Sequence, residues 1–437
     1  MKPVSRGLDR IAVAFDEPNL VANAGLLLVG TVVKKLRLEH LIDTTVRVPS
    51  GQGGFRPGRK VLTLVHAMVA GASHIDHANV LRAGKSAEVL PHQVMAPSTL
   101  GTFLRAFTFG HLRQLEAVAG EALARAWRAT GAPERLVVDI DSTVCEVAGK
   151  KKAGAAYGYT KVLGYHPLLA TRADTGEVLH ARMRKGSANT ARGTRRFVEE
   201  LVARLRRAGA AGTIIFRFDS GYWSKETLQA LGRLKVSYTM AVRTGTKAVS
   251  KTVATIDEGA WATIDYTDDG EAAVAETTYK GRRLVVRRTR LTGPQATFWP
   301  DWRYFAFLTD LTGPAAEVDA FHRQHALCEL DIRDLKEGAG LEHCPSGNFW
   351  ANGAWLACAV LAHNLLRWAQ ILGDIHDLDG DRRPVAARTV RTRFIAMPGR
   401  LVNRSGTPTL RAPLRWPWET AFRHALFSIR SLAIAPT

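Results

Sequence analysis

The sequence is poor in cysteine, in long apolar runs and in acidic side chains. Its 437 residues include only four cysteines, and none of them form a Cys-x-x-Cys pair. This pattern argues against a zinc ribbon or a disulfide framework and fits a reducing compartment. The most apolar runs, 24–33 and 353–366, are too short to cross a bilayer, and no signal peptide opens the chain. We therefore expect a soluble, cytoplasmic protein.

The shortage of acids leaves a large positive charge. The chain has 60 lysines and arginines against 40 aspartates and glutamates, a net charge of +20. This balance indicates a polyanionic partner such as nucleic acid, although some secreted and surface proteins are also basic. An apolar content of 46% is typical of a globular protein, and the length allows more than one domain.

Two apolar runs each end in an aspartate that is followed by small residues. Thr213–Phe218 is β-branched and aromatic, and it predicts a buried strand that leads into Asp219 and Ser-Gly. A second run, from Arg135, leads in the same way into Asp141. Ligands and metals bind at the carboxyl edge of open α/β sheets, so both acids are candidate metal ligands. An aspartate before Ser-Gly is also an ordinary turn former, and that alternative stays open for Asp219.

Asp139 precedes Asp141 by two residues, so the two side chains share one face of the predicted strand. Asp141 is the better candidate ligand because it is nearer the end of the strand. Asp139 is either a partner of the metal ligands or a solvated strand residue, and we favour the solvated residue.

A third acid, Glu329, lies in a segment with helical periodicity that runs from Phe321 to Glu337. Its apolar stripe consists of Phe321, Cys328, Ile332 and Leu335. A narrow polar stripe beside it consists of His322, His325, Glu329 and Lys336. An ordinary amphipathic helix with charged residues beside its apolar stripe accounts for the composition, but it does not explain the regularity of the polar stripe.

These segments resemble bacterial insertion-sequence transposases of the DDE type over roughly residues 130 to 370. The resemblance rests on Asp-Ser-Thr at 141–143, Gly-Tyr-His-Pro at 164–167, Phe-Asp-Ser-Gly-Tyr at 218–222 and the helix around Glu329. The family carries Tyr-x2-Arg-x3-Glu-x6-Lys on the helix with the third acid. In this register the glutamate is Glu329 and the lysine is Lys336, while His322 and His325 replace the tyrosine and the arginine.

The resemblance implies an α/β fold, in which a ribonuclease-H-like mixed sheet is flanked by helices and accompanied by an inserted β-rich subdomain and a helical N-terminal domain. It implies cut-and-paste DNA transposition with two Mg²⁺ or Mn²⁺ ions per active site, held by Asp141, Asp219 and Glu329. The implied partners are double-stranded DNA, as the element's terminal inverted repeats and the target, and a second copy of the chain in a synaptic complex. The implied location is the bacterial nucleoid.

Composition and periodicity suggest where the parts of the chain begin and end. We expect a helical N-terminal DNA-binding domain at 1–130, catalytic core at 131–234, a β-rich insertion at 235–312, the remainder of the core with Glu329 at 313–375, and a basic C-terminal region at 376–437. A helix-turn-helix-like element near 97–106 is one interpretation of the first domain, and a plain helical bundle has slightly more weight. Residues 382–418 hold nine arginines, five prolines and no acid, which predicts a loosely ordered phosphate-binding arm.

Several residues are candidates for DNA contact. Lys336 is expected to contact a phosphate near the scissile bond, and Trp299 is nominated to stack on a flipped base. A basic block with no intervening acid contributes Arg282, Arg283, Arg287 and Arg288.

The family's arginine contact has two candidate replacements. Either His325 or its neighbour Arg323 grips the phosphate, with His322 nearby on the same helix. We favour Arg323, because a free imidazole is mostly neutral at pH 8 whereas a guanidinium is always charged.

Two other classes of function stay open. One is a ribonuclease-H-like nuclease or resolvase that cuts DNA without strand transfer. The other is a non-catalytic DNA-binding protein that descends from a transposase. Metal-dependent DNA cleavage distinguishes a transposase from a non-catalytic DNA-binding protein. Joining of the cut end to a second DNA distinguishes a transposase from a nuclease or resolvase.

Overall fold

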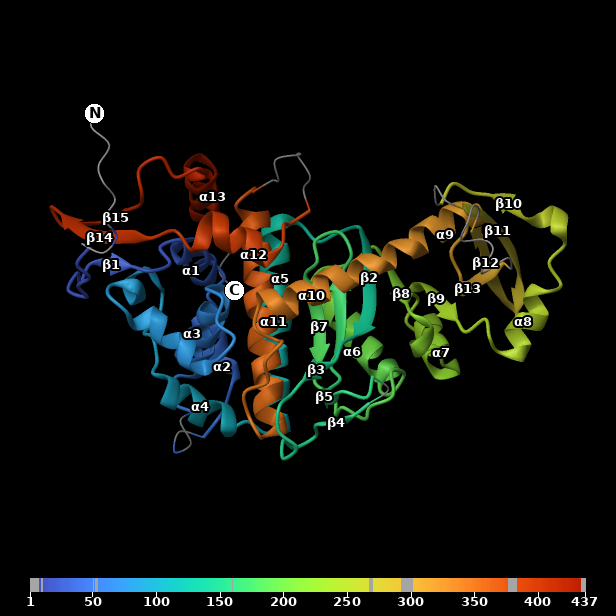
Figure 1. The fold of residues 1–437 in the computed structure, drawn as a ribbon, viewed down its shortest axis with the longest axis horizontal. Helices are drawn as coiled ribbons and strands as arrows, with labels where there is room; N and C mark the ends of the chain where they lie inside the picture. The colour runs from blue at the N-terminus through green and yellow to red at the C-terminus, as the bar shows by residue number, and fades with distance from the viewer. Residues whose placement is uncertain are drawn as a thin grey trace.

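A mixed sheet runs through the middle of the molecule, with helices on one side and a β-rich lobe projecting from the other (Figure 1). The structure is a computed structural model. It describes residues 8, 11–49, 51, 54–158, 160–266, 270–291, 302–375 and 383–433. In this part of the chain, no helix combines the length and the apolar character needed to span a membrane.

The core of the sheet has the strand order β7-β6-β2-β8-β9. β2 pairs antiparallel with β6 and parallel with β8, and β8 in turn pairs parallel with β9. Three strands in a meander followed by two parallel crossover strands form a ribonuclease-H-like core, so the predicted fold class is confirmed. The strand bounds are β2 Arg135–Ser142, β6 Leu168–Arg172, β7 Val178–Arg182, β8 Thr213–Phe218 and β9 Ser237–Val242.

Helices cover this core and join it to the N-terminal region. α6 (Thr194–Arg207) packs on β7, and α7 (Lys225–Arg233) connects β8 to β9. α11 (Phe349–Leu372) is buried along almost its whole length between β7 and the N-terminal helices. Its sequence is apolar all round, as expected for an interior helix, and the Asn348 side chain caps its first turn.

The β-rich lobe continues the core sheet. β13 pairs antiparallel with β9, so the full strand order among the described residues is β10-β11-β12-β13-β9-β8-β2-β6-β7. The expected domain boundary at 234/235 therefore falls between two strands that pair with each other, β8 and β9. β10, the edge strand of this lobe, is only two residues long. The elements of the lobe are α8 Lys247–Val253, β10 Ala262–Thr263, β11 Gly270–Tyr279, β12 Arg282–Leu291, β13 Arg303–Thr309 and α9 Ala315–Arg323.

A small sheet of order β3-β5-β4 lies below the core. Its strands are β3 Cys145–Glu146, β4 Ala156–Tyr157 and β5 Leu163–Tyr165. Residues 163–172 are thereby divided between two sheets: the first part is β5 and the second part is β6. Pro167 separates the two parts, and proline cannot donate a hydrogen bond to a strand ladder.

The N-terminal region is a bundle of helices. Three residues join α4 to α5, a spacing compatible with a helix-turn-helix. However, α5 packs against α11, α2 and β7, which leaves little of it free to enter a DNA groove. The helices are α1 Leu26–Lys35, α2 Leu38–Thr45, α3 Pro57–Val69, α4 Pro97–Arg105 and α5 Phe109–Thr130, with short 3-10 segments at Ile75–Arg82 and Ser86–Val89.

The C-terminal region is folded, which corrects the prediction of a loosely ordered arm over its described residues. β14 (Gly399–Arg404) pairs with β15 and with the N-terminal β1 (Leu20–Val21). Arg391 donates hydrogen bonds to the carbonyls of Val69 and Gly338. Arginines that the sequence leaves without acids are thus satisfied by backbone carbonyls and distant residues. The remaining elements are α12 Ala387–Val390, a π-helical turn at Arg391–Ile395, β15 Thr407–Arg411 and α13 Glu419–Ser431.

Candidate active site

Asp141 and Asp219 lie side by side on one face of the core sheet. The parallel register of β2 and β8 pairs Asp139 with Arg217. Asp141 stands two residues further along β2, and Asp219 is the first residue beyond the end of β8. The parallel register therefore brings both acids to the same edge of the sheet.

The charges around Asp141 show how close this pair is. Burial raises the pKa of Asp141, the backbone hydrogen bond from Ser142 and the charge of His325 lower it, and the charge of Asp219 raises it; the net shift is upward. The hydroxyl of Tyr222, itself fully buried, lies 3.4 Å from Asp141 Oδ1. Two carboxylates that repel each other in this way are stabilised by a shared cation.

Asp219 also has the turn-forming role that its sequence suggests. Its Oδ1 accepts a hydrogen bond from the Ser220 amide at 2.6 Å and caps a short 3-10 turn, Ser220–Tyr222. The side chain is exposed, so this local bond leaves the other carboxylate oxygen accessible. The turn and the candidate ligand role are compatible at this position.

Glu329 stands on a helix that crosses the sheet beside Asp141. α10 (Cys328–Gly338) packs on β2 and β6, and the Cys328 sulfur accepts a hydrogen bond from Thr171 of β6 at 3.7 Å. The Glu329 side chain is exposed. Among the described residues, only one group of three His, Cys, Asp or Glu side chains has its ligand atoms within 4.8 Å of one another. Glu329 does not belong to this group. The sheet places the two aspartates, whereas Glu329 is placed by the packing of α10 on β2 and β6.

The predicted single helix from 321 to 337 is interrupted. α9 ends at Arg323, residues Gln324–Leu327 form a 3-10 segment, and α10 begins at Cys328. A 3-10 turn advances about 120° per residue where an α-helix advances about 100°, so side chains beyond this segment are rotated about the axis relative to one continuous α-helix. Cys328, Ile332 and Leu335 are buried as predicted.

His322 belongs to the predicted polar stripe and packs against two strands. Its ring stacks on Phe307 with a centroid distance of 4.2 Å, and Nδ1 lies 2.7 Å from the Thr239 hydroxyl. Burial, with the charges of His325 and nearby arginines, lowers the pKa of His322 to about 3. His322 therefore contacts β9 and β13, and its ring centroid lies 6.4 Å from that of His325, whereas the Glu329 side chain is exposed.

Asp139 is not a solvated strand residue, and that prediction was wrong. Its carboxylate is 2% exposed and binds Arg217 through two hydrogen bonds of 2.7 Å, while His325 Nδ1 lies 2.7 Å from Oδ1. Burial raises the pKa of Asp139, but the hydrogen bonds and charges of His325 and Arg217 outweigh it and the net shift is downward. Arg217 was not among the predicted site residues, although an arginine inside an otherwise apolar strand indicates a buried charged partner.

The sequence matches a known protein family over almost its whole length. The family described as transposase DDE domain group 1 matches residues 5–434. The chain belongs to this family. Comparison with curated proteins finds no match. Among solved structures, the cryo-EM structure of a piggyBac transposase synaptic complex with hairpin DNA is similar over 86% of this chain and 80% of that one, with 10% sequence identity and a TM-score of 0.45.

For a member of the DDE transposase family, Arg323 lies in an unexpected place. Its Nε donates to Asp319 at 2.9 Å, and its guanidinium sits 4.9 Å from the centre of the Tyr266 ring in the β-rich lobe. His325, in contrast, binds Asp139 and influences the pKa of Asp141. This placement reverses the preference drawn from the sequence, and His325 becomes the candidate nearer the acids.

The predicted basic block is largely neutralised within the β-rich lobe. Arg287 is 8% exposed and pairs with the buried Asp319 at 2.9 Å. Arg288 is equally buried and pairs with Glu258. The acids that the local sequence lacks come from other elements, so the sequence overstated the free positive charge here.

The other two arginines of the block are less buried. Arg282 donates to the Tyr238 hydroxyl at 3.0 Å. Arg283 binds Glu276 and donates to the carbonyl of Leu311 at 2.7 Å. Both remain candidates for DNA contact. Trp299, nominated to stack on a base, lies outside the described residues; its neighbour Trp302 packs against the Arg288 guanidinium at 4.4 Å.

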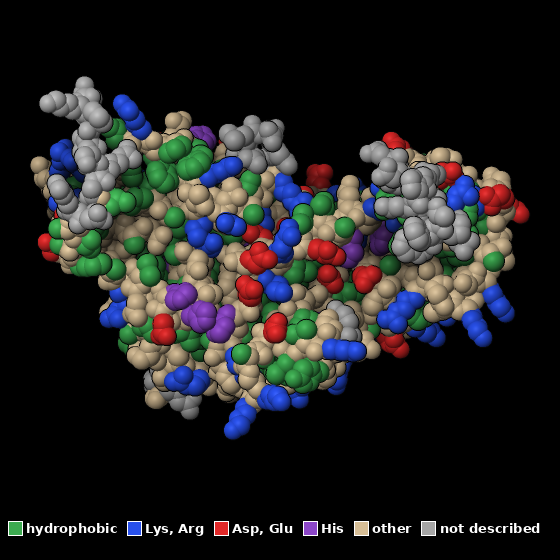
Figure 2. Space-filling model, in the orientation of Figure 1, with side chains coloured by type: hydrophobic (Ala, Val, Ile, Leu, Met, Phe, Trp, Pro, Cys, Tyr) green, Lys and Arg blue, Asp and Glu red, His purple; other side chains and the backbone are tan. Residues whose placement is uncertain are grey.

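Lys336 lies on α10 about two turns beyond Glu329 and is partly exposed. Its charge lies close enough to the buried Cys145, just beyond β2, to oppose the rise in the pKa of that thiol. Figure 2 shows acidic side chains and histidines gathered on the face where α9 and α10 cross the molecule, with lysines and arginines around them. A phosphate contact of Lys336 near the acids stays a prediction.

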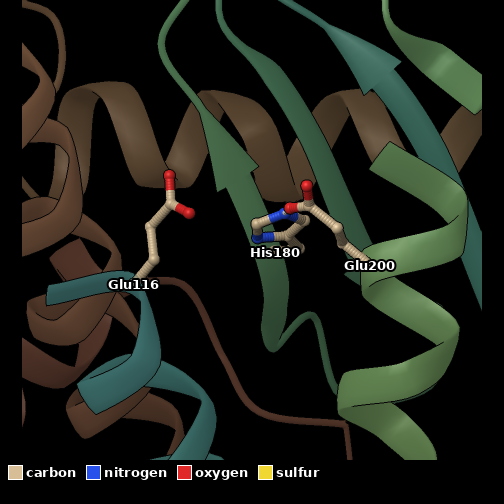
Figure 3. A group of neighbouring side chains, drawn as sticks. All are labelled: Glu116, His180 and Glu200. Atoms are coloured by element: carbon tan, nitrogen blue, oxygen red, sulfur yellow. Dashed lines mark ion pairs between the residues drawn. The ribbon is translucent and has the colours of Figure 1, made fainter. Parts of the chain in front are cut away.

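A second cluster with metal-ligand chemistry lies elsewhere, between α5, β7 and α6. Glu116, His180 and Glu200 come from these three elements and their ligand atoms lie within 4.8 Å of one another (Figure 3). Arg113 Nη1 is 2.8 Å from Glu200 Oε2, and Arg182 also binds this carboxylate. The buried Arg204 lies close enough to lower the pKa of Glu116 against the effect of burial. Three guanidinium charges already offset two carboxylates, so this is an ion-pair network that ties α5 to the core and not a favourable cation site.

Proposed function

We propose that this chain is a transposase that catalyses cut-and-paste transposition of an insertion sequence by metal-dependent phosphoryl transfer. The observation that carries the proposal is the pair Asp141 and Asp219 on adjacent parallel strands, with the helix that bears Glu329 packed beside them. Membership of the DDE transposase family is independent support.

The residues fit two divalent cations of the hard type, Mg²⁺ or Mn²⁺. All three side chains offer carboxylate oxygens, which these ions prefer. The raised pKa of Asp141 reflects burial and the nearby charge of Asp219, two costs that a bound cation relieves. When bound, such ions activate an attacking oxygen and stabilise the leaving oxygen of a phosphodiester.

The protein's own groups would orient this chemistry. Asp141, between Asp219 and the helix, would serve both cations, and Asp219 and Glu329 would each complete one. Tyr222 would hold Asp141 through its hydroxyl. Lys336, Arg282 and Arg283 would bind phosphates of the element's terminal repeats or of the target. Two ends must be held together for transposition, so we propose that a homodimer forms the synaptic complex.

The test is an assay with purified protein, Mg²⁺ and DNA that carries the element's ends and flanks. Asp141→Asn, Asp219→Asn and Glu329→Gln should each abolish cleavage, while DNA binding in gel shift stays near wild type. Each substitution removes a ligand charge but keeps the side-chain shape. Glu337→Gln, an exposed position on the same helix, is the matched control and should cleave normally.

The outcomes separate the alternatives. Cleavage followed by joining of a 3′ end to a second DNA supports a transposase. Cleavage without joining indicates a nuclease or resolvase, and binding without cleavage indicates a non-catalytic DNA-binding protein. Near wild-type cleavage by any one of the three variants would mean that its residue is misassigned.

A further inference from the structure

Directly behind the three proposed ligands lies a second set of three polar side chains. Asp139 precedes Asp141 by two residues on β2, and Arg217 precedes Asp219 by two residues at the end of β8. His325 precedes Glu329 by four residues, across the junction with α10. Each proposed ligand therefore has one member of the inner set two or four residues before it in the chain.

The inner set forms one connected network. Arg217 Nε and Nη2 each lie 2.7 Å from an oxygen of Asp139, and Arg217 Nη1 donates to the carbonyl of Phe321 on α9 at 2.9 Å. His325 Nδ1 lies 2.7 Å from Asp139 Oδ1. The side chains of Asp139 and Arg217 are each 2% exposed, and that of His325 is 15% exposed.

The chemistry fixes the direction of each bond. Asp139 pairs with a guanidinium that cannot be deprotonated, so the carboxylate is ionised and only accepts hydrogen bonds. His325 must therefore donate from Nδ1, which leaves Nε2 as its second polar atom. A desolvated ion pair contributes little net stability, but its short charged bonds hold the geometry closely.

The network matters because backbone bonds position only two of the three ligands. The β2–β8 ladder sets the register of the two strand ends from which Asp141 and Asp219 follow. No strand pairing reaches α10, whose place over β2 depends on side chains. Within the described residues, the direct side-chain hydrogen bonds from this helical segment to β2 and β6 are His325 to Asp139 and Thr171 to Cys328.

We propose that Asp139, Arg217 and His325 act as positioning residues that set the distance of Glu329 from Asp141 and Asp219. The inference rests on the proposed function, because it concerns how that active site is assembled. His325 stands where the family has an arginine, and in this proposal its partner is Asp139, inside the protein. Nδ1 of His325, and not Nε2, carries the role.

Mn²⁺ binding to the full-length protein, followed by electron paramagnetic resonance of the free ion, tests this without DNA or turnover. His325→Ala should weaken Mn²⁺ affinity roughly tenfold or more, the usual cost of losing a group that orients metal ligands. His325→Asn should restore most of the affinity, because the asparagine amide nitrogen takes the place of Nδ1. His325→Gln, whose amide nitrogen takes the place of Nε2, should not.

Asp319→Asn is the matched control. Asp319 lies on the same helical segment, is 1% exposed and binds arginine, but it faces the β-rich lobe. Its loss should lower thermal stability without changing Mn²⁺ affinity.

Wild-type affinity in His325→Ala, or rescue by glutamine instead of asparagine, would overturn the inference. Failure of the proposed function looks different: wild-type protein and Asp141→Asn would then bind Mn²⁺ equally weakly. If His325→Ala does not fold, the comparison of the asparagine and glutamine variants decides.

Discussion

Neutralising Arg287 should destabilise the protein and leave its electrostatic attraction to DNA unchanged. Arg287 is 8% exposed, pairs with Asp319 at 2.9 Å and lies between the rings of Tyr266 and Phe305, at 4.7 and 4.9 Å. Removing one partner of a buried ion pair costs about 3–5 kcal/mol. Arg323 still pairs with Asp319 in the variant, so we expect the low end of this range, about 3 kcal/mol, for Arg287→Met.

The assay combines denaturant unfolding with DNA binding at several salt concentrations. Each phosphate contact contributes about 0.9 to the slope of log K against log salt, which is about 3.5-fold in affinity between 50 and 200 mM. Arg287→Met should keep the wild-type slope and lose about 3 kcal/mol of unfolding free energy. Lys251→Met, an exposed position on α8 of the same lobe, is the control and should keep its stability. A slope reduced by about 0.9 with unchanged stability in Arg287→Met would refute the reasoning and return Arg287 to the DNA interface.

Two further predictions concern histidines. His325→Ala should reduce cleavage more than Arg323→Ala at both pH 6.5 and pH 8, because His325 binds Asp139 whereas Arg323 binds Asp319; a larger defect in Arg323→Ala would restore the preference drawn from the sequence. Burial, with the charge of Arg204, lowers the pKa of His180 to about 3, so its folded-state pKa lies below its unfolded value. As the pH falls, the unfolded state binds a proton before the folded state does, and this lowers the free energy of unfolding. The contribution of His180 is present above pH 6.5, and about 2 kcal/mol is lost between pH 7 and pH 5. His180→Leu should reduce the loss of unfolding free energy over this interval by about that amount, and an unchanged pH dependence would show that His180 is not buried in its neutral form.

The sequence by itself determined the elements that carry the candidate site. An apolar run that ends in an acid is a local pattern, because burial of a strand and release of its end to solvent are both written in adjacent residues. This pattern was sufficient to predict Asp141 and Asp219 at or just beyond the ends of buried strands, whereas the ribonuclease-H-like core was implied by the resemblance to DDE transposases. The buried positions of α10 followed from a helical period over a short segment.

Only the tertiary structure decided which charges are neutralised. Asp139 and Arg217 are 78 residues apart, and their pairing depends on the parallel register of two strands. The acids that bind Arg287 and Arg288 likewise come from 30 or more residues away, so local composition made a paired block look free. The 3-10 segment between α9 and α10 was also not apparent from the sequence, and its different helical twist moves every later side chain around the axis. Charge pairing and helix phase depend on contacts between distant segments, and a pattern within one segment cannot specify them.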